Sequence, residues 1–261
     1  MRKWLNWVAL VILFSIACGF LSNWQFSRRE TKLAAIALVQ RNYELPAATA
    51  ESLVAHGHAN LDRDIWRSIT LTGRYQPTAT LLVRNRPNNG NGGFEELVPF
   101  ASQELGIVYV SRGWIASGDK QDYPDSVPLP TTEQITLTGK ILAAEPILDR
   151  TAPKGEISTI NVRLADKLTG LHSGLHNAYL READEVPGVG PKLTAMPSPS
   201  LDEGNNLSYA VQWIIFAIMA VAALIWRIRR DRQLELGIEP KRKITRADRD
   251  NAAEDAVTTA K

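Results

Sequence analysis

The chain has 261 residues, of which 22% are charged, and its formal net charge is +2 at pH 7. This composition excludes disorder over most of the length, and it gives no basic field for nucleic acid, which we do not expect as a partner. The single cysteine, Cys18, excludes an intramolecular disulfide framework.

An uncharged stretch begins directly after the first basic residues. Arg2 and Lys3 precede a run from Trp4 to Ser27 that carries no charge and is long enough to cross a bilayer. A cleaved signal peptide is the alternative, but the run is longer than a signal's apolar region and no small-x-small cleavage site follows it. We therefore expect a retained transmembrane helix over 4–24, which continues as a helix beyond the membrane.

Small residues in this first helix predict contact with another helix. Ser15 and Gly19 are four positions apart, so they share one helical face along which a second helix could approach closely. Cys18 lies in the same stretch, and we interpret it as a small packing residue rather than a reactive thiol.

The region between about residues 28 and 205 shows the two-residue period of β-strands. Residues 46–60 predict a linker with a short helix, and 186–201 predict an extended segment. Pro99 predicts that its strand lies at an edge or a bulge. Short strands separated by turns favour an antiparallel sheet or a small barrel. The expected strands are 66–75, 80–85, 94–102, 106–115 and 134–142, followed by a strand-to-helix segment over 158–168 and a last strand over 177–181.

A second uncharged run lies near the end of the chain. It extends from Gly204 to Trp226 and, as a helix, would span roughly 30–35 Å, about the thickness of a hydrocarbon core. Four arginines follow within six residues, a pattern that holds a helix end in the cytoplasm. The basic residues just after the first run oppose this orientation, whereas the two at the N-terminus support it.

The expected fold class is α+β, with two transmembrane helices bracketing a β-rich extracytoplasmic domain that also has a few helices. The expected location is a bacterial plasma membrane, crossed twice, with both termini cytoplasmic. The expected boundaries are 1–3 for the cytoplasmic N-terminus, 4–24 for the first span, 25–207 for the extracytoplasmic domain, 208–226 for the second span and 227–261 for a cytoplasmic, largely disordered tail.

The sequence contains no recognisable catalytic constellation. His172 and His176 have a spacing that suits a metal on a helix, but two glycines in the same segment argue against a helix there. Ser111 lies at a strand end without a partnered histidine, so it does not predict a nucleophile. We expect a binding or assembly protein with no metal site, not an enzyme. A hydrolase whose serine, histidines and carboxylates meet only in the fold is the alternative.

Four groups of residues, in order along the chain, resemble motifs of the Surfeit locus protein 1 family, whose members assist the assembly of cytochrome c oxidase. The groups extend over residues 23–213, within the same two-span architecture. They are Trp24 and Gln25 with Arg28; Arg86 and Pro87 with Gly93, Phe94 and Pro99; Val110 to Trp114, which includes Arg112 and Gly113; and Asn205 to Trp213.

The resemblance implies a role in the maturation of oxidase subunit I, with haem a as a candidate cofactor. The implied partners are subunit I or its assembly intermediates, membrane lipids and haem a synthesis enzymes. In the family's motif a histidine lies three residues before the tyrosine, and here that position is Asn206. An amide is a poor iron ligand, so we carry no haem ligand over. A membrane-anchored extracytoplasmic binding or scaffold module with no respiratory role is the alternative.

Two sets of residues are candidate binding surfaces. One lies at the head of the second span and would form a platform for haem or a partner helix; the alternative is an interfacial anchor, with Asn205 or Asn206 as a helix cap. The other set would form a cationic surface for a haem propionate or an acidic partner. The alternative is that the triplet Arg112-Gly113-Trp114 only stabilises a turn. The platform set is Asn206, Tyr209, Gln212 and Trp213, and the cationic set is Arg84, Arg86 and Arg112.

Overall fold

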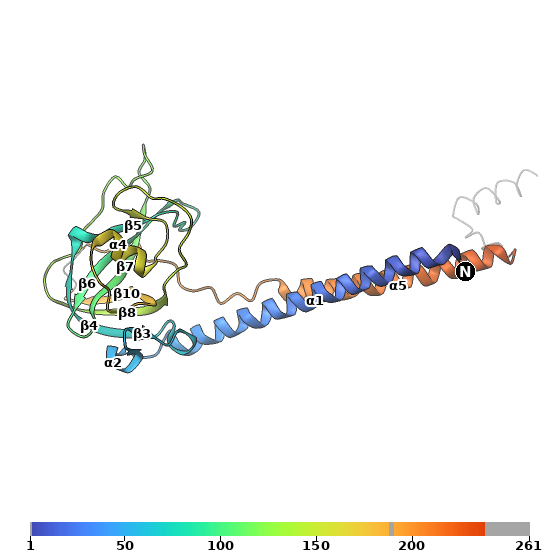
Figure 1. The fold of residues 1–261 in the computed structure, drawn as a ribbon, viewed down its shortest axis with the longest axis horizontal. Coiled ribbons are helices and arrows are strands. Elements are labelled where there is room, and N and C mark those ends of the chain that lie inside the picture. Colours follow the sequence, from blue (N-terminus) through green and yellow to red (C-terminus); the bar gives the residue numbers. More distant parts are fainter. Residues whose placement is uncertain (1, 188–190, 238–261) are drawn as a thin grey trace, which may run out of the picture. The chain divides into compact units, whose positions relative to one another are not determined.

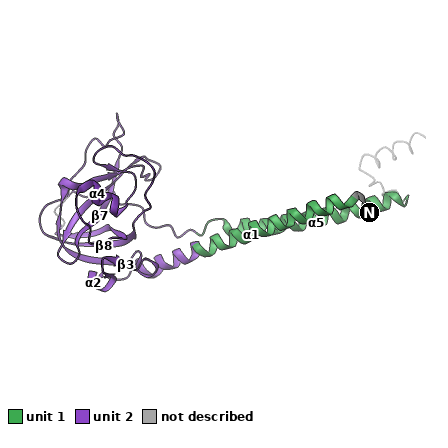
Figure 2. Cartoon of the chain, viewed as in Figure 1, with its two compact units in different colours: residues 1–31, 203–261 green, residues 32–202 purple. Residues whose placement is uncertain are grey.

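The computed structural model describes residues 2–187 and 191–237, and the chain divides into two compact units (Figure 2). The first, called here the helical unit, holds the chain up to Thr31 and from Glu203 onward. The second, called the β unit, extends from Lys32 to Asp202.

The helical unit is built from two long helices. They are α5 (Asn206–Glu235) and the part of α1 (Arg2–Asn42) that ends at Thr31. Both helices are long and apolar enough to cross a membrane, and only 11% and 6% of their most apolar windows are buried. Most of this apolar surface therefore has no protein cover, as expected of helices that face lipid.

The ends of the two helices differ in part from the sequence expectation. The continuation of the first helix beyond residue 24 is confirmed, because α1 is unbroken to Asn42. The second helix also continues, to Glu235, so the first residues of the segment expected as a disordered tail are helical. The rest of that segment, residues 238–261, lies outside the described residues.

Within the helical unit, α1 and α5 pack in antiparallel directions. Ser22 Oγ donates a hydrogen bond of 3.0 Å to the Ala210 carbonyl, and Arg29 pairs with Glu203 at 2.9 Å. Near the other end of the pair, the Arg227 guanidinium lies 5.1 Å from the Trp7 ring centroid. Positions far apart in the sequence thus meet in reverse order along the two helices.

Small residues do line the contact between these helices, but one expected member is wrong. Cys18 and Ser22 are buried, with 1% and 5% of their surfaces exposed, whereas Gly19 is exposed and has no other heavy atom within 4 Å of a built Cβ. The buried positions follow the alternating three- and four-residue spacing of a two-helix seam, which passes from Ser15 to Cys18 rather than to Gly19. The packing role expected of Cys18 is confirmed.

The β unit contains a closed five-stranded barrel (Figure 1). Neighbouring strands are antiparallel except for β7 and β10, whose parallel contact covers only two residue pairs. The small barrel expected from the sequence is therefore present, with one parallel seam. In order around the barrel, the strands are β4 (Ser68–Tyr75), β8 (Ile135–Ala143), β10 (Ala178–Val186), β7 (Gly106–Ala116) and β6 (Gly93–Ser102), which pairs again with β4.

Shorter elements extend the sheet beyond the barrel. The region expected as a linker, 46–60, belongs to the fold, because β1 adds a strand parallel to β4. The strand expected to begin at residue 158 lies slightly earlier, as β9. The elements are β1 (Ala48–Thr49), α2 (Ala50–Leu53), β2 (Val54–Ala55), β3 (His58–Ala59), α3 (Leu61–Asp64), η1 (Pro77–Ala79), β5 (Leu81–Val83), β9 (Glu156–Ile157) and α4 (Val162–Thr169).

Alternate residues of the barrel strands form two apolar layers, as the two-residue period predicts. Along β7, for example, Val108 and Val110 belong to the cluster that fills the barrel, while Tyr109 belongs to a second cluster outside it. The second cluster also contains Val162 and Ala165 of α4. The short helix α4 covers this outer face because its apolar side chains share one side.

Pro99 does not lie at a sheet edge, but its strand does contain an irregularity, which was the other possibility expected. Strand β6 pairs with β7 along its whole length, and on its other side it pairs first with β5 and then with β4. Pro99 falls where β6 changes from β5 to β4, and its carbonyl accepts from Gln76 N at 2.8 Å. A missing N–H at this junction removes no bond of a continuous ladder. The register shift in β6 lies between Glu96 and Leu97.

We predict that Gly73→Ala destabilises the barrel. A Cβ at Gly73 would lie 2.1 Å from the carbonyl oxygen of Ala101, where β4 joins β6 to close the barrel. Forcing these backbones apart should cost about 1–3 kcal/mol, which lowers Tm by about 2–12 °C for a domain of this size. Thermal unfolding of the full chain in detergent measures the change.

Gly92→Ala is the matched control, because its built Cβ meets only Ser117 Oγ at 3.9 Å. Equal Tm values for the two variants would show that β4 and β6 are not closed as described.

Candidate functional site

Two of the motif groups meet at one corner of the β unit. The indole Nε1 of Trp114 in β7 donates to the Arg86 carbonyl at 2.6 Å. The Arg86 N–H donates to the carbonyl of Gly93, the first residue of β6, at 2.9 Å. Pro87 follows on the exposed side of this corner. Trp114 thus fixes the backbone at Arg86, 28 positions away in the sequence.

The triplet Arg112-Gly113-Trp114 holds a later part of the chain, residues 191–198, called here the strap. Trp114 N donates to the Thr194 carbonyl at 2.7 Å, and Arg112 Nη2 donates to the Pro191 carbonyl at 2.8 Å. A Cβ at Gly113 would lie 2.8 Å from the Thr194 oxygen. The glycine is therefore needed for the strap to lie against β7, which supports the structural interpretation of the triplet.

The three arginines of the expected cationic surface are each paired with a carboxylate. Arg84 pairs with Glu156 at 2.5 Å, Arg86 with Glu145 at 2.7 Å, and Arg112 with Glu96 at 2.7 Å. The side chain of Arg112 is only 1% exposed, against 25% and 22% for the other two. The structure does not bring Arg112 together with Arg84 and Arg86, and a cationic surface formed by these residues stays a prediction.

Arg112 belongs to a buried ionic cluster with Glu96, Glu182 and Tyr75. Glu182 Oε2 accepts from the Tyr75 hydroxyl at 2.7 Å and lies 3.5 Å from Arg112 Nε. Burial raises the pKa of Glu96 to about 7, although Arg112 opposes this shift. Burial also raises the pKa of Glu182, against the hydrogen bond from Tyr75. The cluster can therefore hold a proton close to neutral pH.

A second carboxylate cluster lies on the other side of β6. Ser111 Oγ donates to Glu95, and Glu95 lies 3.3 Å from Arg86 Nε. Arg86 also contacts Glu145, which accepts from Ile160 N at 2.8 Å. These contacts lower the pKa of Glu145 despite its burial. Neither cluster was predicted from the sequence. The two adjacent glutamates, Glu95 and Glu96, in an otherwise apolar strand could have indicated them.

The alternative of a hydrolase receives limited support. Ser111 is within hydrogen-bonding reach of Glu95, but both residues are at least 99% buried. Among the described residues no hydrogen bond joins Ser111 to a histidine, and no group of three metal-ligating residues occurs. His176 instead packs edge-on against His58, with ring centroids 5.2 Å apart.

The four platform residues divide between two environments at the start of α5. Tyr209 and Gln212 are exposed, whereas Asn206 and Trp213 are half-buried. The Trp213 ring packs against Phe216 at 5.8 Å and 87°. Asn205 occupies the N-cap position of α5, as the alternative interpretation allowed, but makes no side-chain cap bond. Asn206 Nδ2 donates to the Glu203 carbonyl at 3.4 Å. Tyr209 and Gln212 are therefore the members of this set most accessible to a partner, and Trp213 is partly accessible.

The first motif group lies on α1 in the same helical unit. Trp24 is 53% exposed, and the Arg28 guanidinium lies 5.5 Å from its ring centroid. Gln25 is half-buried on the side of Ser22, which contacts Ala210. The first and last motif groups thus lie on the two helices that pack together.

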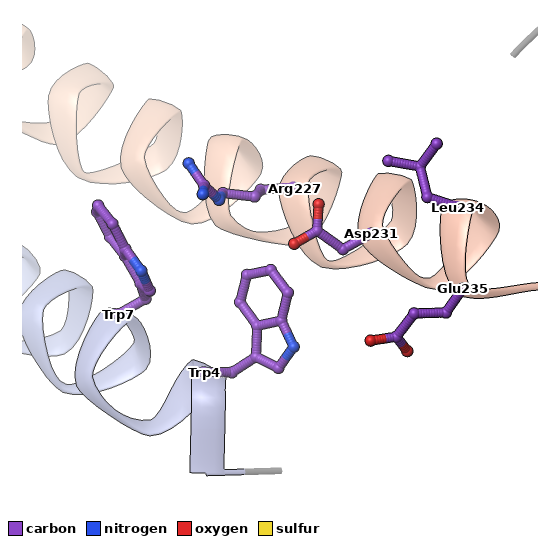
Figure 3. Close-up of a pocket in the computed structure, with 6 residues that line it drawn as sticks. All are labelled: Trp4, Trp7, Arg227, Asp231, Leu234 and Glu235. Atoms are coloured by element: carbon purple, nitrogen blue, oxygen red, sulfur yellow. The ribbon is translucent and has the colours of Figure 1, made fainter.

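A cavity of about 380 Å³ lies between the first turns of α1 and the last turns of α5 (Figure 3). Trp4 and Trp7 line it from α1, and Arg227 and Asp231 line it from α5. Tryptophan and arginine together are typical of a helix end at a membrane–water interface.

All four motif groups lie within a region that matches a known protein family. The model of the SURF1 family matches residues 12–218. The chain belongs to the SURF1 family. A SURF1-like protein of Mycobacterium bovis is 28% identical over 247 residues, covering 91% of this chain and 89% of the relative. SURF1-like proteins of Rickettsia bellii and Rickettsia conorii are 23% and 24% identical, covering 91% and 92% of this chain and 95% of each relative.

We predict that the buried cluster makes stability depend on pH. The folded pKa of Glu96, about 7, lies above the ordinary value of 4.5. A raised carboxyl pKa adds stability below about pH 4.5, and that stability is lost as pH rises through 7. Between these two limits, the contribution of Glu96 to the free energy of unfolding changes by about 3 kcal/mol. Tm should therefore fall less between pH 5.5 and 8 for Glu96→Gln than for the unaltered chain.

The difference between the two chains isolates this residue from other titrating groups. Glu133→Gln serves as the control, because the Glu133 side chain is exposed and does not belong to the buried cluster. Identical pH profiles for Glu96→Gln and the unaltered chain would contradict the prediction.

Proposed function

We propose that this SURF1 family member is an integral membrane assembly factor for cytochrome c oxidase that acts on the maturation of subunit I. The observation that carries the proposal is the family match, which includes most of α1's apolar part, the barrel and the first half of α5. The family is generally linked to oxidase assembly. The motif residues also occupy defined structural positions, in two groups, one within each unit.

The proposal places both helices across the plasma membrane with both termini in the cytoplasm. The supporting features are the apolar exposed surfaces of α1 and α5 and the arginines that follow Trp226. Because the helices are antiparallel, the ends that carry Trp7 and Arg227 would lie on the same side of the membrane. The β unit, which follows α1 and precedes α5, would then be extracytoplasmic.

The mechanism we propose is binding rather than catalysis. The polar clusters around Ser111 and Arg112 are buried and satisfied mainly within the protein, so they suit shape maintenance better than contact with a substrate. The exposed Tyr209 and Gln212 side chains on α5 are available for a helix of subunit I. Aromatic and amide side chains of this kind suit packing and hydrogen bonding at a membrane interface.

The described residues do not fit haem ligation at the motif position. Asn206 takes the place of the family's histidine, and its amide nitrogen donates to the Glu203 carbonyl. All four histidines of the chain lie in the β unit. We therefore propose haem a only as a ligand held by ring contacts with Tyr209 and Trp213. No iron ligand is proposed at the Asn206 position.

We predict that deletion of the gene lowers the amount of assembled haem–copper oxidase while transcripts of the oxidase subunits persist. Loss of an assembly factor removes a late step, so synthesis of the subunits should continue. Reduced-minus-oxidised spectra of membranes, together with transcript levels, measure both quantities. Reintroduction of the unaltered chain is the control. Normal oxidase spectra in the deletion strain would overturn the assignment, and a pull-down with envelope proteins but no oxidase subunits would favour a module without a respiratory role.

A second prediction concerns the platform. The full chain, purified in detergent from cells that make haem a, should retain a haem a band that Tyr209→Ala or Trp213→Ala removes. Leu234→Ala, at the other end of α5, should keep the band. Absence of a band from the unaltered chain, with oxidase subunits co-purifying, would eliminate haem binding and leave a protein scaffold.

A further inference from the structure

Two basic side chains lie directly opposite each other on the outer face of the barrel. Lys140 of β8 and Arg181 of β10 are register partners in an antiparallel pair. Directly opposite residues project to the same face, and like charges in this position destabilise a sheet. Within the part of the chain that the structure describes, neither side chain has a carboxylate within 4.0 Å. Glu44 acts on Lys140 only through the longer-range Coulomb interaction.

This lack of an acidic partner contrasts with three other basic residues of the β unit. Arg84, Arg86 and Arg112 each pair with a buried or half-buried carboxylate. On β10 the next residue, Glu182, projects to the barrel interior, where it contacts Tyr75 and Arg112. In the described part of the chain Glu182 is therefore paired with Arg112 and forms no ion pair with Arg181.

Aromatic rings and neutral oxygens hold the two cations in place. Lys140 Nζ lies 4.0 Å from the Tyr43 ring centroid and donates to the Tyr43 carbonyl at 2.7 Å and to Ser68 Oγ at 3.2 Å. The Arg181 guanidinium lies 5.3 Å from the Trp66 centroid and donates to Pro197 O at 3.3 Å. Arg181 Nε is buried without a hydrogen-bond partner among the described residues. The site thus has a positioned, unused donor.

The cations line a cavity large enough for a ligand. Its volume is about 420 Å³, and the strap, which includes Lys192, forms one wall. Glu182, Asp184 and Glu185 also line the cavity. Tyr43 and Ser198 also line an adjoining apolar groove of about 360 Å³ with Val39, Pro199 and Leu201. A polar cavity next to an apolar groove suits a ligand with a charged head.

We propose that Lys140 and Arg181 form a binding site for a phosphate group, either free or in a lipid headgroup. The planar guanidinium supplies directional donors and the ammonium a point charge, a combination that suits phosphate oxygens. A bound dianion would turn the repulsion between the two cations into attraction for a shared ligand. This proposal is independent of the role in oxidase assembly.

The test uses the full chain in dodecyl maltoside, without phosphate in the buffer, and measures Tm as the anion is added. Inorganic phosphate and micelles doped with phosphatidic acid are the probes, and sodium chloride at equal ionic strength and phosphatidylcholine are their controls. A ligand at ten times its Kd should raise Tm by about 3–6 °C. A response to inorganic phosphate indicates a soluble source, and a response to phosphatidic acid alone indicates a lipid. Either response supports the site.

Variants connect the response to the two residues. Arg181→Gln and Lys140→Gln should each weaken binding at least tenfold, whereas Arg163→Gln, on the exposed side of α4, should leave it unchanged. Arg181→Lys retains the charge if the glutamine variant does not fold, and it should bind with intermediate affinity. An equal Tm rise with chloride, an unchanged response in Arg181→Gln and Lys140→Gln, or no response to either phosphate probe would overturn the proposal.

Discussion

The buried ion pair between Arg112 and Glu96 is the constraint on which the β unit depends. Their side chains are 1% and 0% exposed and lie 2.7 Å apart. An isolated charge in this position would be strongly unfavourable, whereas a paired and hydrogen-bonded one is tolerated. Arg112 also donates to the carbonyls of Pro128 and Pro191. One side chain therefore joins β6, β7, a long loop and the strap, and removing its charge would leave Glu96 buried without a partner.

The need for this pair follows from the way the barrel closes. Strands β7 and β10 remain in contact for only two residue pairs, so beyond Arg181 the barrel wall would be open without the strap. The Trp114 N–H of β7 is then bonded to the Thr194 carbonyl instead of to another strand. The same strap forms a wall of the cavity with Lys140 and Arg181. The motif triplet that fixes the strap thus also shapes a potential binding site.

Local patterns in the sequence predicted most strands but not which strands pair with each other. Residues 66–75, 106–115 and 134–142 alternate because one side of each strand faces the barrel core, and this alternation is visible without a structure. The parallel contact of β7 with β10 and the role of Pro99 depend on pairing between distant segments, which a local period does not encode. The seam passes from Ser15 to Cys18 and Ser22 rather than to the expected Gly19, because the register between two helices is set by both surfaces. Glu95 and Glu96 were overlooked because each needs a partner from another strand.

The position of Asn206 bears on how a member of this family could act. The residue at the motif's histidine position offers an amide, and its nitrogen is directed to the Glu203 carbonyl. Other motif residues described above fix backbone segments, as Trp114 does with Arg86, or lie beside the contact between two helices, as Gln25 does next to Ser22. Such contacts define the shape of a surface and need no bound metal. A function that rests on presenting this surface to a membrane partner can persist without an imidazole, whereas transfer of iron-bound haem from this position cannot.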